Sequence, residues 1–140
     1  MKKAWILGAL VVTAIGASAQ AVIGQPAPAF STLDANGKTV SLADFKGKHV
    51  VLEWVNPGCP YVQKHYNSGN MPATQKATIA QGVTWLAVSS TAKDAGDYRA
   101  PKDLVSWIEG KGGKPSATLM DDSGKIGRAY GARTTPHMYL

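Results

Sequence analysis

The sequence predicts an α/β fold with a largely parallel sheet. Segments rich in β-branched and aromatic residues alternate along the chain with segments suited to amphipathic helices. The clearest strand, Val50 to Val55, is apolar except for Glu53 and leads into a helix-compatible segment, Pro60 to Tyr66. The only cysteine, Cys59, lies between the two. The 140 residues suffice for one domain with a modest core.

The start of the chain has the three-part pattern of a secretory signal peptide. A basic start at Lys2 and Lys3, an apolar run from Trp5 to Ile15 and a series of small residues follow one another. An uncleaved membrane anchor is the alternative, but the apolar run is short for a membrane span. We therefore expect a cleaved signal peptide over residues 1–21 and a domain over residues 22–140. The protein would be periplasmic or secreted, with no stable membrane association after cleavage.

The charge pattern argues against nucleic-acid binding. The formal net charge is +6, and without Lys2 and Lys3 it is +4, because 13 basic residues then face 9 acidic ones. The basic residues are scattered, with no Lys/Arg block and no interleaved aromatic residues. An exported location permits disulfides, yet one cysteine cannot form an internal one. The thiol therefore needs an intermolecular partner or a reactive role.

A β-hairpin is expected before the central strand. A proline-rich, extended segment, Ile23 to Phe30, leads into two short apolar segments, Phe30–Leu33 and Thr39–Leu42. Asp34-Ala-Asn-Gly37 separates them, and Asn-Gly between apolar segments is a strong hairpin signal.

Two helical pieces are expected after Cys59. The stretch 67–70 is loop-like, and Asn70 suits the cap of a second piece that has Pro72 in its first turn and runs to about Ala80.

The rest of the chain continues the alternation of strands and helices. Val83–Val88 has the composition of a second buried strand, and Pro101 opens a helix with Leu104, Val105 and Ile108 on one face. The remaining expected elements are a strand at Ala117–Met120, a helix at Lys125–Tyr130 and a last strand at His137–Leu140. The chain stops within this apolar strand, which indicates that the sequence is truncated at its C-terminus.

Cys59 lies where the pattern places the start of a helix. Asn56-Pro-Gly58 turns the chain, and Pro60 suits the first helical position. The unpaired N–H groups at a helix N-terminus carry about half a positive charge, which stabilises a thiolate and lowers the thiol pKa. The alternative is a small buried hydrophobic residue, the usual state of a lone cysteine. The position between a buried strand and a helix favours the reactive thiol.

Three segments carry a family resemblance: Ile23–Phe30 with its Gly-x-x-Ala-Pro-x-Phe pattern, Val50–Val62, and Thr135-Pro136. They resemble the lead-in, the strand–Cys–helix core and the cis-proline of the thioredoxin-fold superfamily. The closest resemblance is to the peroxiredoxin-like branch of the alkyl hydroperoxide reductase/thiol-specific antioxidant (redoxin) family. Residues 117–130 are similar to the strand–helix insertion that precedes the cis-proline in that group. The resemblance covers Val22 to Leu140, and the family's final strand and helix have no counterpart here.

The resemblance implies a thiol-dependent oxidoreductase that uses Cys59 as a thiolate nucleophile toward peroxide or a disulfide. An external thiol would reduce the product, with no cofactor and no metal. The chain departs from its relatives at three positions: Val62 replaces the second cysteine of Cys-x-x-Cys, and Leu52 and Asn56 replace the peroxiredoxin proline and threonine. These departures keep a second function open, a non-catalytic binding module for thiol-containing or peptide clients.

Glu53 matches a buried acid that takes part in proton transfer in thioredoxin. Burial would raise its pKa, as a proton shuttle requires. The alternative is an ion pair with a lysine such as Lys48 at the strand rim. Asn56 can hydrogen-bond in place of the peroxiredoxin threonine. Cys59, Glu53 and Asn56 are therefore the candidate catalytic residues.

Pro60, Thr135 and Pro136 are the candidate substrate-binding residues. The resemblance implies that a cis Pro136 leaves the Thr135 backbone free to pair with an extended substrate. It also implies an arginine that stabilises the thiolate, a role open to Arg128 or Arg133.

The histidines are weaker candidates. His65 follows Cys59 by six residues, so a helix turns it away from the sulfur, and a solvated or packing role is expected. His137 can lie nearer. A copper site is disfavoured because Gln63 stands where exported copper chaperones have a second cysteine, which leaves Cys59 and His137 as a weak soft-ligand set.

Overall fold

The computed structural model describes residues 20–140, so nearly all of the expected signal peptide lies outside the described residues. The elements in order are β1 (Ser31–Asp34), β2 (Thr39–Ser41), the 3-10 helix η1 (Leu42–Phe45), β3 (Val50–Trp54), α1 (Pro60–Asn67), α2 (Asn70–Ala80), β4 (Thr84–Ser89), α3 (Pro101–Gly110), β5 (Ala117–Met120), α4 (Lys125–Tyr130) and β6 (His137–Tyr139). None of the helices within residues 20–140 is long and apolar enough to cross a membrane.

The strands form one mixed sheet in the order β2-β1-β5-β4-β3-β6. β3, β4 and β5 are parallel, as the alternation of strands and helices predicts. β1 and β2 form the expected antiparallel hairpin, β1 is antiparallel to β5, and β6 is antiparallel to β3. The expected largely parallel sheet is thus correct for the three central strands only. The short turn between β1 and β2 requires an antiparallel pair, while the antiparallel pairs β1–β5 and β3–β6 join strands far apart in the chain.

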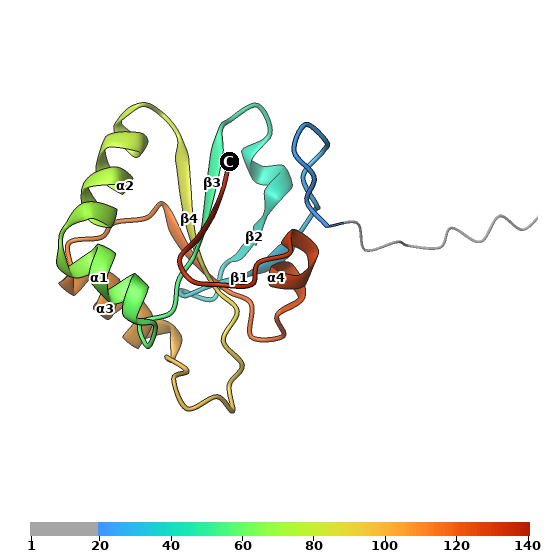
Figure 1. The fold of residues 1–140 in the computed structure, drawn as a ribbon. Coiled ribbons are helices and arrows are strands. Elements are labelled where there is room, and N and C mark those ends of the chain that lie inside the picture. The colour runs from blue at the N-terminus through green and yellow to red at the C-terminus, as the bar shows by residue number, and fades with distance from the viewer. Residues whose placement is uncertain (1–19) are drawn as a thin grey trace, which may run out of the picture.

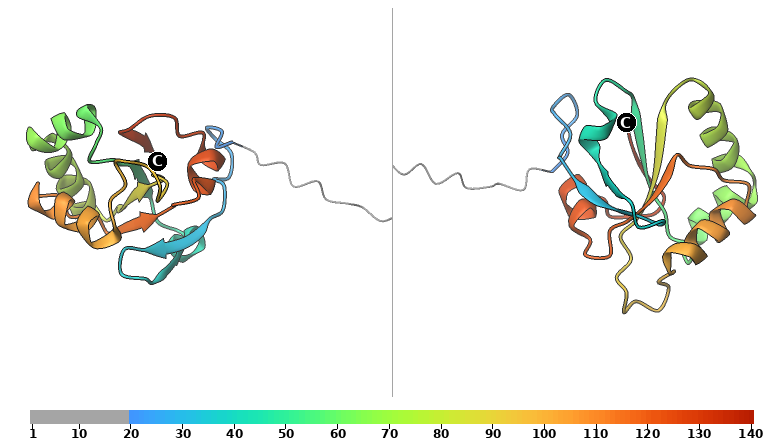
Figure 2. Two further views of the ribbon diagram at one scale, coloured as in Figure 1. Left: turned by 90° about the horizontal axis from the view of Figure 1, so that it is seen from below. Right: turned by 180° about the vertical axis from the view of Figure 1, so that it is seen from behind.

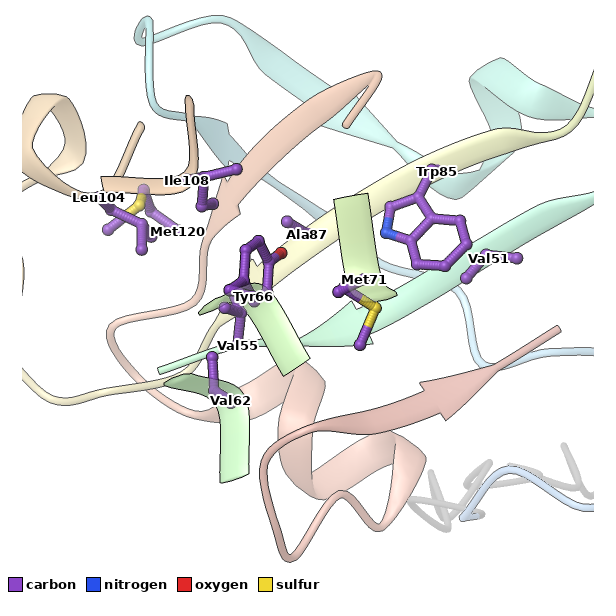
Figure 3. Packing of buried hydrophobic residues seen from close by; sticks show 10 residues of the cluster. All are labelled: Val51, Val55, Val62, Tyr66, Met71, Trp85, Ala87, Leu104, Ile108 and Met120. Atoms are coloured by element: carbon purple, nitrogen blue, oxygen red, sulfur yellow. The ribbon is translucent and has the colours of Figure 1, made fainter. Parts of the chain in front are cut away.

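Two hydrophobic layers hold the sheet. Helices α1, α2 and α3 cover one face and α4 lies on the other (Figures 1 and 2). The cluster on the first face comprises Val51, Val55, Val62, Tyr66, Met71, Trp85, Ala87, Leu104, Ile108 and Met120 (Figure 3). The cluster on the second face comprises Val40, Leu52, Trp54, Leu86, Val88, Leu119, Ile126 and Tyr130. β3 and β4 supply alternate residues to both clusters, as expected for strands that are buried on two sides.

The break between α1 and α2 lies where the sequence predicts it, but its cap is different. Gly69 caps α2 with a φ of 75°, a left-handed conformation that glycine adopts without steric cost. Asn70 is the first residue of the helix rather than its cap, and its side-chain amide lies 3.0 Å from Nδ1 of His65.

The topology brings the ends of three strands together. β3 and β4 are parallel neighbours, so their C-terminal ends lie at the same edge of the sheet. β6 is antiparallel to β3 and pairs His137 with Trp54, so the segment before β6 arrives at the end of β3. The β4–α3 loop and the start of α1 lie at this same end of the sheet (Figure 1).

Leu86→Ala should lower the free energy of unfolding by about 2–5 kcal/mol, because Leu86 of β4 is fully buried and its truncation leaves a cavity between packed layers. Leu33→Ala is the matched control, since Leu33 of β1 is 52% exposed. Urea unfolding of both variants measures the difference. Equal losses would contradict the assignment of the core.

Candidate functional site

Cys59 is the N-cap of α1, with Pro60 at the first helical position. Its thiol is half-buried, and Sγ donates a hydrogen bond to the carbonyl of Thr135 at 3.1 Å. The carbonyl of Cys59 accepts a hydrogen bond from the N–H of Gln63 at 3.0 Å, which closes the first turn of the helix. Sγ therefore lies at the positive end of α1, as the sequence predicts.

The environment favours the thiolate. Burial raises the pKa of Cys59, but hydrogen bonds from the Thr135 side chain and from the backbone N–H groups of Val62 and Tyr61 outweigh burial and lower the pKa below its ordinary value. Two of these donors are orphan N–H groups of the first helical turn, which have no partner within the helix. The groups that lower this pKa are Thr135, Val62 and Tyr61, and a role for Arg128 or Arg133 at the thiolate stays a prediction.

The segment that faces the sulfur is the loop before β6. The Thr135–Pro136 peptide bond is cis, as the resemblance implies. Thr135 and Pro136 are half-buried, while Pro60, which follows Cys59 in the chain, is exposed. The three candidate substrate-binding residues therefore lie around Cys59, and their contact with a substrate remains a prediction.

Asn56 holds the turn that carries the cysteine. Its Oδ1 accepts the N–H of Gly58 at 2.7 Å, and its Nδ2 donates to Oδ2 of Asp97 at 2.6 Å and to Oγ1 of Thr91 at 3.3 Å. A Cβ on Gly58 would lie 2.9 Å from Cβ of Asp97, so the loop packs directly on the glycine. The amide N–H groups of Asn56 are thus engaged within the protein, and its direct action on a substrate remains a prediction.

The sequence gives no sign of Asp97 as part of this site. It lies 41 residues beyond Asn56 in a small, polar loop that carries no recognisable motif. Only the folded β4–α3 loop brings its carboxylate to the cysteine turn.

Glu53 is fully buried beneath α1 and α2. Its carboxylate accepts hydrogen bonds from Nε1 of Trp85 at 2.7 Å, the hydroxyl of Tyr66 at 2.8 Å and Nε2 of Gln75 at 2.9 Å. Burial raises the pKa of Glu53, and these three hydrogen bonds oppose the rise. The alternative of an ion pair with Lys48 is wrong, because uncharged donors from β4, α1 and α2 surround the carboxylate.

The histidines do not complete a metal site. His65 contacts Asn70 through Nδ1, in line with a packing role. Nδ1 of His137 lies 3.4 Å from the N–H of Arg133, and its ring stacks near Tyr139 at 4.7 Å. Residues 20–140 contain no cluster of three or more His, Cys, Asp or Glu side chains that could hold a metal ion.

The family model for the AhpC/TSA family matches residues 23–140. The chain belongs to the AhpC/TSA family. No similar sequence is found among curated proteins. The AhpC/TSA family comprises thiol oxidoreductases, which agrees with a thiol at a helix N-terminus facing a cis-proline loop.

Solved structures agree with this assignment. An uncharacterized conserved protein from Geobacillus kaustophilus superposes with a TM-score of 0.72 at 24% identity, over 83% of this chain and 61% of its own. The thioredoxin domain of a thiol-disulfide oxidoreductase from Bacteroides vulgatus gives a TM-score of 0.63 at 26% identity, over 85% of this chain and 80% of its own. A secreted disulfide oxidoreductase from Mycobacterium tuberculosis gives 0.61 at 20% identity, over 78% and 72%. The chain thus spans about three fifths of the Geobacillus protein and has a thioredoxin-like fold.

Glu53→Gln should change the pH dependence of stability. A carboxyl whose pKa is raised by folding contributes stability below its unfolded pKa, near 4.5, and this contribution is lost as the pH rises through the folded value. Relative to the wild-type protein, the free energy of unfolding of the variant should therefore rise as the pH increases from the unfolded to the folded pKa of Glu53. Urea unfolding from pH 4 upward measures the difference, and a difference that does not vary with pH would contradict a raised pKa.

Thr135→Val should raise the pH midpoint for alkylation of Cys59, because the variant removes a side-chain donor that lowers the thiol pKa. The rate of iodoacetamide modification across pH, followed by intact mass, gives this midpoint. Thr134→Val is the matched control and should keep the wild-type midpoint. Identical midpoints in all three proteins would rule out the Thr135 hydroxyl as a donor to the thiolate.

Proposed function

We propose that this AhpC/TSA-family protein is an exported thiol oxidoreductase that uses Cys59 as its single redox-active residue. The observation that carries the proposal is the placement of Sγ at the N-terminus of α1, 3.1 Å from the Thr135 carbonyl, with a lowered pKa. Half-burial leaves the sulfur open to a small molecule or an extended chain. A thiolate in such a microenvironment is a nucleophile at neutral pH.

The reaction begins when the Cys59 thiolate attacks one sulfur of a disulfide. The S–S bond breaks, a mixed disulfide forms at Cys59, and the other half leaves as a thiolate. An external thiol then attacks the mixed disulfide, releases a new disulfide and restores the Cys59 thiol. Toward a peroxide, the thiolate attacks one oxygen, the O–O bond breaks, and Cys59 becomes a sulfenic acid, which two equivalents of external thiol reduce to thiol, water and a disulfide.

The lone cysteine requires an external thiol in both reactions. Val62 occupies the position of the second cysteine in Cys-x-x-Cys and is fully buried, and Cys59 is the only cysteine of the chain. The contacts of Asn56 favour the disulfide reaction, because its amide donors are engaged by Asp97 and Thr91 rather than directed at an oxidant.

Glu53 is the candidate acid for proton transfer in this reaction. Burial raises its pKa, which shifts the carboxyl toward the protonated form that a general acid needs. A role for Glu53 in turnover predicts that Glu53→Gln slows reduction of the mixed disulfide without changing the folded structure.

The engaged amide of Asn56 also supports the second candidate function. A protein that retains the fold without turnover could hold a thiol-containing client as a mixed disulfide or bind an extended peptide at the Thr135–Pro136 loop. If a Cys59→Ser variant captures the same client as the wild-type protein, peptide binding is favoured over redox turnover.

A direct test is the intact mass of the reduced protein, lacking residues 1–21, after one equivalent of oxidant. 2-Hydroxyethyl disulfide should give a mixed disulfide at Cys59, and hydrogen peroxide with a sulfenic-acid trap should give a trapped adduct. Cys59→Ser is the control and should give neither product. If the folded wild-type protein reacts no faster than a free cysteine peptide with either oxidant, the oxidoreductase proposal fails and the binding function becomes the better account.

A further inference from the structure

A polar cavity of about 240 Å³ lies beside the cysteine loop. It opens between the ends of β3 and β4, the first turn of α4 and the loop before β6. Its polar lining residues are Asn56, Ser90, Thr91, Arg133, Thr134 and Thr135. Thr135 connects the cavity to the reactive thiol, because its carbonyl accepts the hydrogen bond from Sγ of Cys59.

One positive charge lines this cavity. Arg133 is its only charged lining residue, and no carboxylate lines it. Within residues 20–140 the one ion pair joins Lys93 to Asp122, so Arg133 has no acidic partner there. The two nearby carboxylates are engaged, Asp97 by the amide of Asn56 and Asp121 by Ser90 and the N–H of Gly127.

Hydroxyl groups complete the donor set. Oγ1 of Thr91 accepts a hydrogen bond from Asn56, which leaves the Thr91 proton available to a ligand. The hydroxyl of Thr134 lines the same cavity and has no hydrogen-bond partner within residues 20–140. A guanidinium beside two hydroxyl donors matches the needs of a carboxylate, which only accepts hydrogen bonds.

We infer that this cavity is a subsite for a carboxylate of the disulfide or thiol that exchanges with Cys59. The inference rests on the proposed thiol oxidoreductase function and names its substrate class, a small disulfide or thiol with a carboxylate a few bonds from sulfur. The volume is below the roughly 300–1,000 Å³ of pockets that hold whole small molecules, so the cavity takes one end of the substrate while its sulfur meets Sγ. Exchange forms the Cys59 mixed disulfide and releases a carboxylate-bearing thiolate.

Two disulfides that differ in charge test the subsite. 3,3′-Dithiodipropionate carries carboxylates, and 2-hydroxyethyl disulfide is the neutral counterpart. The selectivity is the exchange rate with the charged disulfide divided by the rate with the neutral one. The selectivity of wild-type Cys59 should be about three to ten times that of a free cysteine peptide, as one partly exposed charge-assisted pair allows. The selectivity should fall as salt is added, because an exposed charge pair is screened.

Arg133→Gln should lower the preference for the charged disulfide to that of the free peptide, and Arg133→Lys should keep part of this preference. Arg128→Gln is the matched control, since Arg128 lies with Arg133 beside a neighbouring hollow but does not line the cavity. An unchanged selectivity in Arg133→Gln, or an equal loss in Arg128→Gln, would overturn the inference. If Arg133→Gln slows both disulfides equally, Arg133 acts on the thiol and not on the carboxylate, which also overturns it.

The rate with the neutral disulfide tests the proposed function separately, because it does not involve the carboxylate. Propionate provides a readout that needs no exchange chemistry. In an NMR titration it should shift the amide resonances of Thr134 and Thr135 in the wild-type protein and leave them unmoved in Arg133→Gln. Resonances that stay fixed in the wild-type protein would overturn the subsite even if Cys59 exchanges rapidly.

Discussion

The antiparallel pairing of β6 with β3 is the constraint on which the site depends. It matches Trp54 with His137, Glu53 with Met138 and Leu52 with Tyr139. Since β6 begins where β3 ends, the loop before β6 must arrive beside the turn that follows β3. This register places the Thr135 carbonyl on Sγ of Cys59. A slip of one residue would turn every side chain of β6 to the opposite face of the sheet, so the ring contacts of the half-buried Tyr139 with Trp54 and Tyr130 also fix the site.

The cysteine turn depends equally on a contact between distant segments. Asn56 lies two residues beyond β3, its Oδ1 accepts the N–H of Gly58, and its Nδ2 donates to Asp97 of the β4–α3 loop. Glycine is needed at position 58 because a side chain there would collide with Asp97. The position of the thiol is therefore a property of three segments, β3, the turn and the β4–α3 loop, and not of the helix N-terminus alone.

The sequence predicted the elements well because each has a local signal. The Asn-Gly hairpin, the nearly continuous apolar strands and the helix at Lys125–Tyr130 depend on residues close in sequence, and all are present. Cys59 at the start of α1 was predicted for the same reason. The direction of β6, the contact of Asp97 with Asn56 and the donors to Glu53 could not be predicted, since each joins residues separated by a whole structural unit. The alternative of a lysine paired with Glu53 was wrong, because tertiary packing, which no local pattern encodes, supplied Trp85, Tyr66 and Gln75 as its partners.

Alternation along β3 divides the chemistry of the site between the two faces of the sheet. Glu53 points toward α1 and α2, where Tyr66, Gln75 and Trp85 bind its carboxylate. Its neighbour Trp54 points to the opposite face, where its Nε1 donates to Ser90 and its ring lines the polar cavity. Cys59 lies just beyond the end of the strand, between a dry network built around one buried acid and a cavity whose only charge is Arg133. Because the sheet separates these two environments, the residues around the buried acid and the residues that line the cavity can change independently of each other. The proposed proton transfer and the proposed substrate preference at Cys59 would therefore depend on different residues.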